Sequence, residues 1–340
     1  METTEIATIQ NYPWHQESWD YFVKAHDKNH LPHALLIVGE NGIGKLDFAN
    51  RLVKSLLCIT AHENSVNDSV DNKRKYDACN HCKACKTYES QANPDYLNID
   101  LLEDKQQIGI DQVRQLSTFL SLSRSFNSYR VVLLNQVERM NLNAANSLLK
   151  SLEEPTNNTV IILLTSQLNR LLPTMKSRCQ ILKLPTPIKA VAQEWIQHHS
   201  PEINNPEELL DMAYGKPLAA LKIDAEEIQS RKKLSKDLIG LINNKESITA
   251  VAKTWEKYNS ELLLNWQITW VQDFIKQSIQ DKPLNNSEEK QTLTLLELSQ
   301  LKSVAQLWQI YHELIKQKRY IHTSVNPLMF VENMLMLWCK

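Results

Sequence analysis

Short apolar runs alternate with amphipathic stretches along the first part of the chain. Each run is short enough for a strand, and the runs lie at residues 34–38, 96–102, 130–135, 160–165 and 179–184. Between them, apolar positions recur with helical spacing in residues 45–58, 110–123 and 141–155. Buried strands that alternate with helices are typical of a parallel sheet covered on both faces. We therefore predict an α/β fold for this part of the chain.

The pattern changes after residue 185. Predicted strands vanish, residues 190–223 carry short helical stretches, and from about residue 229 the amphipathic helices are longer. Five of the eight tryptophans belong to this last part, namely Trp255, Trp266, Trp270, Trp308 and Trp338. We expect these large side chains to fill the core of an all-α bundle rather than to bind a cofactor. Residues 61–77 are polar, which predicts a surface insertion.

Length and charge narrow the possible functions. A chain of 340 residues is long enough for two or three domains. The formal net charge of −1 gives no overall attraction to nucleic acid or membranes, so such contacts need a local patch. No apolar run reaches the roughly 18 residues that a bilayer span needs, and the N-terminus lacks the basic and apolar regions of a secretory signal. We therefore expect a cytoplasmic protein without membrane contact.

A glycine-rich loop follows the first apolar run. Gly39, four further residues, Gly44 and Lys45 have the spacing of a phosphate-binding loop, and Gly42 lies between them. The predicted strand before the loop and the predicted helix after it are the context that such a loop requires. In such loops, backbone N–H groups hold phosphate oxygens and the lysine reaches the outer phosphates. We therefore predict a nucleotide loop formed by these four residues.

The groups that would bind magnesium at this loop are missing. Leu46 stands where the motif needs a hydroxyl, and the run at 130–135 leads into Asn135 and Gln136 where Asp and Glu are expected. Amides keep the shape of carboxylates but lack the charge that binds Mg²⁺ and the basicity that activates water. Because stabilisation of the transferring phosphate supplies most of the catalysis, we expect that ATP or ADP could be held but not hydrolysed.

Four of the six cysteines fall in one segment. Cys79, Cys82 and Cys85 have C-x2-C-x2-C spacing, and Cys58, at the end of the preceding predicted helix, can supply a fourth thiolate. This spacing suits a tetrahedral zinc ion, while an iron–sulfur cluster and unmetallated thiols are the alternatives. We predict a structural zinc site, without a catalytic role because four thiolates leave no open position for water.

Several segments resemble bacterial clamp-loader subunits of the AAA+ superfamily. They are "LPHALLIVGENGIGK", the cysteine insertion, "NPDYLNID", "IGIDQVRQL", "NAANSLLKSLEEP" and "LLPTMKSRCQIL", and they follow one another in the order seen in that family. The altered loop and the amide-substituted strand resemble the non-motor subunits more than the gamma/tau motor. The resemblance covers residues 10–225 well and is weaker over the helical remainder.

The resemblance implies a three-domain architecture. A RecA-like AAA+ domain would span residues 1–185, with the zinc module at 58–85 as an insertion. A small helical lid would follow at 186–228. The last part, 229–340, would be a helical collar that joins five subunits into a ring.

The resemblance also implies roles for single residues. Within the Ser177-Arg178-Cys179 motif, the arginine would project into the ATP site of the adjacent motor subunit as an arginine finger in trans. Leu218 occupies the lid position where motor subunits place a phosphate-sensing arginine. Thr165 fits the polar sensor position, and we expect it to be structural.

The implied function is that of a non-catalytic stator in the clamp loader of bacterial DNA polymerase III. Its ring partners would be gamma/tau and delta subunits, and the complex would load the sliding clamp onto primed DNA. The isolated chain would be inactive as an ATPase, although it belongs to a nucleotidyltransferase holoenzyme. One alternative is an ATP-hydrolysing motor of gamma/tau type, which Leu46, Asn135 and Gln136 oppose. Another is a zinc-dependent nucleic-acid-binding module, which the near-zero net charge opposes.

Overall fold

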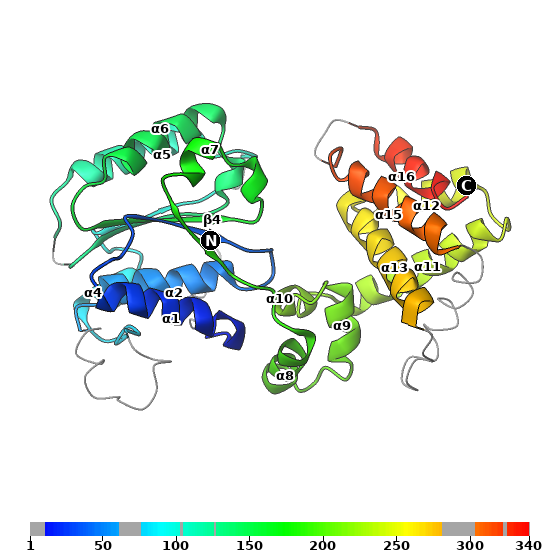
Figure 1. Cartoon of the computed structure of the whole chain (residues 1–340), viewed down its shortest axis with the longest axis horizontal. Coiled ribbons are helices and arrows are strands. Elements are labelled where there is room, and N and C mark those ends of the chain that lie inside the picture. Colours follow the sequence, from blue (N-terminus) through cyan, green and yellow to red (C-terminus); the bar gives the residue numbers. More distant parts are fainter. Residues whose placement is uncertain are drawn as a thin grey trace. The chain divides into compact units, whose positions relative to one another are not determined.

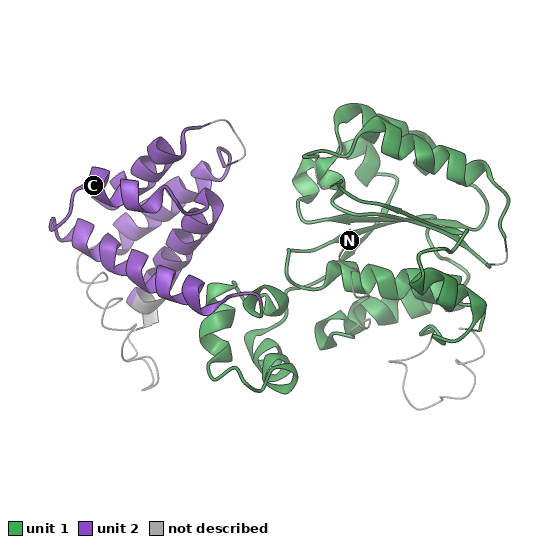
Figure 2. Cartoon of the chain, turned by 180° about the vertical axis from the view of Figure 1, so that it is seen from behind, with its two compact units in different colours: residues 1–221 green, residues 222–340 purple. Residues whose placement is uncertain are grey.

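A computed structural model of the chain describes residues 11–60, 76–102, 105–125, 127–280, 303–321 and 325–339. The chain divides into two compact units, residues 1–221 and residues 222–340, which Figure 2 shows in different colours. The large buried clusters of apolar side chains fall within one unit or the other.

The first unit is built on a sheet of five parallel strands (Figure 1). The strands are β1 (Ala34–Val38), β2 (Tyr96–Ile99), β3 (Arg130–Leu134), β4 (Thr159–Thr165) and β5 (Gln180–Lys183). Their order across the sheet is β2-β3-β4-β1-β5, so β1 lies between β4 and β5. Each predicted apolar run overlaps one strand, and the predicted α/β fold with a parallel sheet is confirmed.

Helices cover both faces of the sheet. The helices of this unit include α1 (Gln16–Asp27), α2 (Lys45–Leu57), α4 (Lys83–Glu89), α5 (Ile110–Ser121), α6 (Leu142–Glu153), α7 (Pro173–Lys176), α8 (Lys189–His199), α9 (Pro206–Met212) and α10 (Pro217–Ala220). Figure 1 shows α1 and α2 on one face and α5 and α6 on the other. In β1, Leu35 and Ile37 pack among side chains of α1 and α2, whereas Ala34 and Leu36 pack among those of α5 and α6. Because both faces are covered, every position of the strand is apolar.

A buried arginine joins the sheet to the end of α5. Arg130, the first residue of β3, is 3% exposed, and its guanidinium donates to the carbonyls of Phe119 and Leu120. It also lies 3.9 Å from the fully buried carboxylate of Asp95. That carboxylate accepts the N–H of Ser125. The charge is therefore paired and hydrogen-bonded, as burial requires.

The second unit is helical. Its helices include α11 (Ala225–Ile242), α12 (Ile248–Trp255), α13 (Ser260–Gln280), α15 (Val304–Gln317) and α16 (Pro327–Met336). Four of the five tryptophans lie in its core, two of them anchored by indole hydrogen bonds: Trp338 to Gln267 and Trp255 to Asp237. Trp308 differs, since it is 44% exposed on α15. The helical bundle with an aromatic core is therefore present, with one of these tryptophans outside it.

The division into units differs from the three domains inferred from the sequence. The boundary falls between Leu221 and Lys222, so α8, α9 and α10 belong to the first unit. The separation of a lid at 186–228 from a sheet domain at 1–185 stays a prediction. Most of the predicted surface insertion lies outside the described residues. In the part of the chain that is described, no helix has the length and apolar character needed to cross a bilayer.

Candidate functional site

The glycine loop connects the end of β1 to the start of α2. Gly42 and Gly44 have φ angles of +84° and +86°, in the left-handed region that favours glycine. A Cβ on Gly42 would lie 2.7 Å from the Cβ of Ala219, and one on Gly44 would lie 2.3 Å from the ring of Tyr12. The two glycines are therefore required by the left-handed backbone of the turn and by the close contact of Ala219 and Tyr12 with the loop.

Lys45, the first residue of α2, is held by its own loop. Its Nζ donates to the carbonyl of Glu40 at 2.8 Å and to Oδ1 of Asn41 at 3.1 Å. Burial lowers the pKa of Lys45 to about 8, against the opposing effect of the carboxylates of Glu138 and Glu40. Leu46 follows with 42% of its surface exposed, so the position that needs a magnesium ligand presents an apolar side chain to solvent.

The end of β3 carries the two amides. Asn135 donates through Nδ2 to Oδ2 of Asp100 at 3.1 Å, and its Oδ1 accepts the N–H of Gln136 at 3.0 Å. Gln136 has a φ of +51° and leads into the short turn Val137–Arg139. The amide of Asn135 is thus used to bridge to a neighbouring acid, a bond that a carboxylate at this position could not donate.

Glu138 is an acid near the loop that the sequence reasoning missed. Its Oε1 accepts the hydroxyl of Ser166 at 2.7 Å and the N–H of Ser166 at 3.2 Å. Burial alone would raise the pKa of Glu138, but hydrogen bonds from Ser166, from Thr165 and from its own backbone together outweigh burial, and the pKa is lowered. Thr165, the residue before Ser166, accepts the N–H of Gly39 through its carbonyl. This bond ties the end of β4 to the loop. An acidic residue just after β3 was the signal available in the sequence.

Residues of α10 pack directly on the loop. The N–H of Leu218 donates to the carbonyl of Gly42 at 3.1 Å, and Lys216 forms an ion pair with Glu40. Leu218 therefore contributes a backbone contact at the position where a motor subunit would carry a phosphate-sensing arginine. Gly215, three residues before Leu218, has a φ of +74°, in the left-handed region that favours glycine.

Aromatic residues from the segment before α1 also cover the loop. The Tyr12 hydroxyl donates to Asp47 at 2.8 Å, and the Trp14 indole donates to the carbonyl of Ile43 at 2.9 Å. The two rings stack with centroids 4.9 Å apart, and Trp195 of α8 meets both edge-on. This cover was not predicted, because it brings together residues more than 180 positions apart in the sequence.

Arg178 lies at the other end of the strands. It precedes β5, whose first residue Gln180 pairs with Leu35 near the start of β1, whereas the loop follows Val38 at the end of β1. Parallel strands rise about 3.3 Å per residue, so the length of β1 separates the arginine from the loop. Arg178 and the glycine loop therefore lie at opposite ends of the parallel strands.

The Arg178 guanidinium has partners within the chain. Its Nη2 lies 2.6 Å from Oε1 of Glu153, at the end of α6, and its Nη1 donates to the carbonyl of Thr174 at 3.0 Å. Ser177 donates through its hydroxyl to the same carbonyl, and burial raises the pKa of the Cys179 thiol to about 11. The arginine side chain keeps 35% of its surface exposed, so it can still meet a second molecule.

The four cysteines that were predicted to bind zinc lie together. Their Sγ atoms are all within 4.8 Å of one another. The pairs Cys58–Cys82 and Cys79–Cys85 are each 3.9 Å apart, and a tetrahedral zinc ion with Zn–S bonds of about 2.3 Å separates its sulfur atoms by about 3.8 Å. The cluster therefore has the size of a single-ion site.

Hydrogen bonds at the cysteines also suit a metal. The N–H of Cys79 points to Sγ of Cys58, and the N–H of Cys82 to Sγ of Cys79, each at 3.3 Å. A hydrogen bond from the Cys85 thiol lowers the pKa of Cys58 to about 4, and the same bond raises the pKa of Cys85. Cys58 thus favours the thiolate form that metals bind, with Cys85 as its thiol donor.

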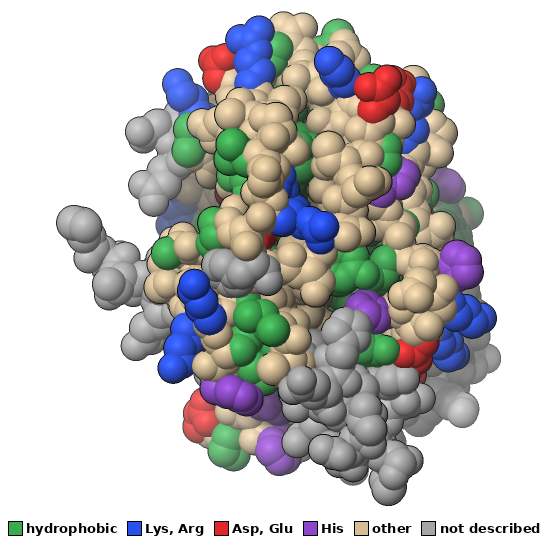
Figure 3. Space-filling view, turned by 90° about the vertical axis from the view of Figure 1, so that its left-hand side faces the viewer, with side chains coloured by type: hydrophobic (Ala, Val, Ile, Leu, Met, Phe, Trp, Pro, Cys, Tyr) green, Lys and Arg blue, Asp and Glu red, His purple; other side chains and the backbone are tan. Residues whose placement is uncertain are grey.

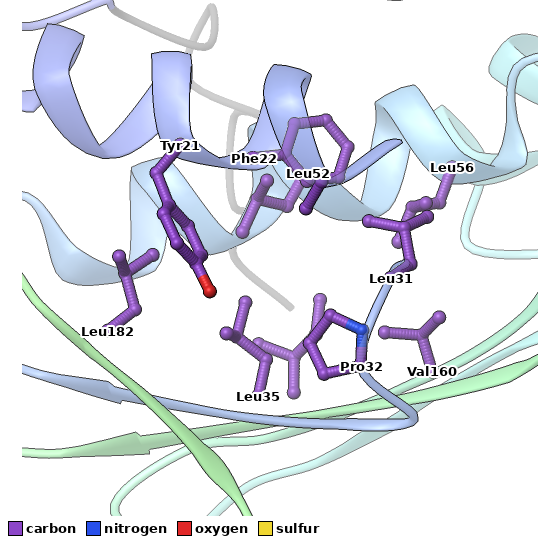
Figure 4. A pocket seen from close by; sticks show the side chains of 11 residues that line it. Tyr21, Phe22, Leu31, Pro32, Leu35, Leu52, Leu56, Val160 and Leu182 are labelled. Carbon is purple, nitrogen blue, oxygen red and sulfur yellow. The ribbon is translucent and has the colours of Figure 1, made fainter. Parts of the chain in front are cut away.

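Two other features lack the groups that a functional site needs. Figure 4 shows a pocket between α1, α2 and the sheet, and among the residues that line it only Tyr21 carries a polar side chain. This pocket offers no acid or base for chemistry. On the face in Figure 3, Lys and Arg side chains are scattered among polar and apolar ones, without a dense basic stripe in its described part. That arrangement does not favour a nucleic-acid-binding module.

The fold and the altered loop define a RecA-like protein of the AAA+ class with an incomplete magnesium site. A family model described as DNA polymerase III, delta subunit matches residues 14–187. The DNA polymerase III subunit delta′ of Pseudomonas aeruginosa is 30% identical over 337 residues, which cover 97% of each chain. The chain belongs to the delta-prime family of DNA polymerase III clamp-loader subunits.

Two further relatives match a smaller share of the chain. The subunit delta′ of Haemophilus influenzae is 27% identical over 79% of this chain and 78% of its own. The DNA polymerase III subunit tau of Bacillus subtilis is 31% identical, over 44% of this chain and 24% of its own. A solved gamma subunit-related protein from Thermotoga maritima covers 94% of this chain and 98% of its own at 18% identity. Its TM-score of 0.36 is too low to support an argument.

Proposed function

We propose that this chain is the non-catalytic stator of the DNA polymerase III clamp loader and acts in the cytoplasm. It supplies Arg178 to the ATP site of a neighbouring motor subunit while the complex loads the sliding clamp onto primed DNA. The observation that carries the proposal is the position of Arg178. It is partly exposed and lies at the opposite end of the strands from the chain's own loop, so its target is a nucleotide held by another subunit.

The proposed partners are gamma/tau and delta subunits in a hetero-pentameric ring. Membership of the delta-prime family supports a place in this complex, and the similarity to a tau subunit over 44% of the chain supports a shared architecture. The helical second unit would act as the collar that joins the subunits. In this arrangement the clamp and the primed DNA are reached through the complex.

The loop supports a stator rather than a motor. Lys45 is engaged by Glu40 and Asn41, and α10 is hydrogen-bonded to Gly42. Leu46 and Asn135 provide neither the hydroxyl nor the carboxylate that would bind magnesium. ATP or ADP held here would be a structural ligand, and the gamma/tau-type motor remains the alternative.

The cysteine cluster is proposed to hold a structural zinc ion. When bound, zinc would cross-link Cys58, at the end of α2, to the segment that carries Cys79, Cys82 and Cys85. This segment is also tied to α2 by an ion pair between Arg51 and Asp77, 2.7 Å apart. The metal would therefore stabilise the module and take no part in a reaction.

Replacing Arg178 in the reconstituted clamp loader tests this function. We expect Arg178→Ala to assemble normally and to slow hydrolysis at the ATP site that it completes by about 10³-fold, because the guanidinium neutralises charge that develops on the transferring phosphate. The measurement is ATP hydrolysis by the ring, with clamp and primed DNA present. Arg170→Ala changes an exposed arginine of the same segment and serves as the matched control. Wild-type hydrolysis by the Arg178→Ala ring would exclude the proposed role.

A further inference from the structure

Glu153 contacts the arginine at the centre of the proposed function. It is the last residue of α6, and its Oε1 lies 2.6 Å from Nη2 of Arg178. The helix beneath it is firmly placed, since Asn141 caps its start by accepting the N–H of Ala144 at 2.8 Å and Leu152 is buried against the sheet. The backbone at Glu153 is therefore fixed relative to the core of the first unit.

Two fixed acceptors define how the guanidinium is presented. The carboxylate of Glu153 pairs with Nη2 of Arg178, and the carbonyl of Thr174 accepts a hydrogen bond from Nη1. A guanidinium has five N–H donors in one plane, so two anchors orient the plane and leave donors free for a further acceptor. An unanchored arginine would lose rotamer freedom on binding a phosphate. Because of the two anchors, Arg178 has already lost part of this rotamer freedom in the isolated chain.

We propose that Glu153 is a positioning residue for Arg178, holding the guanidinium in the orientation in which it meets the nucleotide of the neighbouring motor subunit. This inference rests on the proposed trans role of Arg178. The ion pair contributes little to folding, because both side chains are partly exposed, 35% for Arg178 and 48% for Glu153. Its effect is therefore expected in the rate of hydrolysis and not in the stability of the chain.

Two substitutions separate geometry from charge. Glu153→Ala removes the acceptor, whereas Glu153→Gln keeps an oxygen at the same position without the negative charge. If orientation is the function, the glutamine variant rescues the activity that the alanine variant loses. Glu154, the next residue, is also exposed, so Glu154→Ala removes the same charge at the adjacent position and is the matched control.

The experiment uses the reconstituted clamp-loader complex with clamp and primed DNA. We expect Glu153→Ala to lower the maximal rate of ATP hydrolysis by about 3- to 10-fold, because a misplaced catalytic group loses rate, with the KM for ATP and the melting temperature of the chain unchanged. Glu153→Gln is expected to keep at least about half of the wild-type rate, and Glu154→Ala all of it. In an Arg178→Ala background, Glu153→Ala is expected to cause no further loss, since the two residues act as a unit.

The outcomes distinguish this inference from the function on which it rests. If Arg178→Ala slows the ring and Glu153→Ala leaves the rate unchanged or raises it, Glu153 is not a positioning residue and the trans role of Arg178 stands. An equal loss from Glu153→Ala with and without Arg178 would also overturn the inference. If Arg178→Ala itself has no effect, the proposed function fails first.

Discussion

Lys45 belongs to an intact phosphate-binding motif. In a motor its amino group binds the outer phosphates of the nucleotide, but here it is bonded to Glu40 and Asn41 of its own loop. The groups that would recruit magnesium are replaced by Leu46 and by Asn135, whose amide is bonded to Asp100. The loop therefore keeps its shape through local contacts, and we propose that it does not support phosphate transfer.

The histidine beneath the loop predicts a pH dependence of folding. His15 is 2% exposed, and burial lowers its pKa from 6.5 to about 4. Well above pH 6.5 the His15 ring is neutral in both the folded and the unfolded chain, so it does not reduce the free energy of unfolding. As the pH falls from 6.5 towards 4, the unfolded chain binds a proton that the buried ring does not, so the free energy of unfolding falls by about 3 kcal/mol in total.

Urea unfolding of the wild type and of His15→Asn at pH 7 and pH 5 measures this effect. We expect the wild type to lose more stability than the variant over this interval. The variant is the control because the other histidines titrate in both proteins. An equal loss in the two proteins would show that His15 is not the group responsible.

Local spacing determined which functional residues could be found in the sequence. Lys45 and the cysteines belong to short motifs, so their roles could be inferred without a fold. Glu138 and Glu153 contact residues 28 and 25 positions further along the chain, Ser166 and Arg178, and no local pattern marks such a pair. The same holds for the aromatic cover of the loop, which depends on tertiary packing.

Strands and helices of the sheet domain could be predicted because their burial is periodic. The predicted ends of the strands were less accurate than their existence. The run at 96–102 forms a strand only as far as Ile99. The carboxylate of the next residue, Asp100, accepts the N–H of Leu101 at 2.7 Å and also accepts a hydrogen bond from the amide of Asn135. Polar side chains at strand ends compete for backbone groups in this way.

The zinc module predicts a link between metal content and stability. Purified protein is expected to contain one zinc ion per chain, and Cys82→Ser is expected to lose it and to lower the melting temperature by about 5 °C or more, because metal binding contributes directly to folding. Metal analysis and thermal unfolding measure the two effects. Cys339→Ser, which changes an exposed thiol of the second unit, is the control and should retain both. Wild-type protein with neither zinc nor iron would rule out a metal site.

At the level of the whole chain, composition and pattern indicated an α/β part followed by a helical part, and the two compact units agree with that order. The position of the division could not be read from the pattern. Helices α8 to α10 look like a separate helical segment in the sequence, but α10 is hydrogen-bonded to the loop and Trp195 of α8 packs on Tyr12. Contacts of this kind decide domain membership, and they are not periodic.

The proposed function requires that this chain does not hydrolyse ATP and instead completes the ATP site of another subunit. Phosphate release by the purified, isolated chain with ATP and Mg²⁺ tests this most directly, with Lys45→Ala as the comparison. We predict that the wild type releases phosphate no faster than the Lys45→Ala variant. Steady, magnesium-dependent release by the wild type that Lys45→Ala abolishes would contradict the account and identify the chain as a motor.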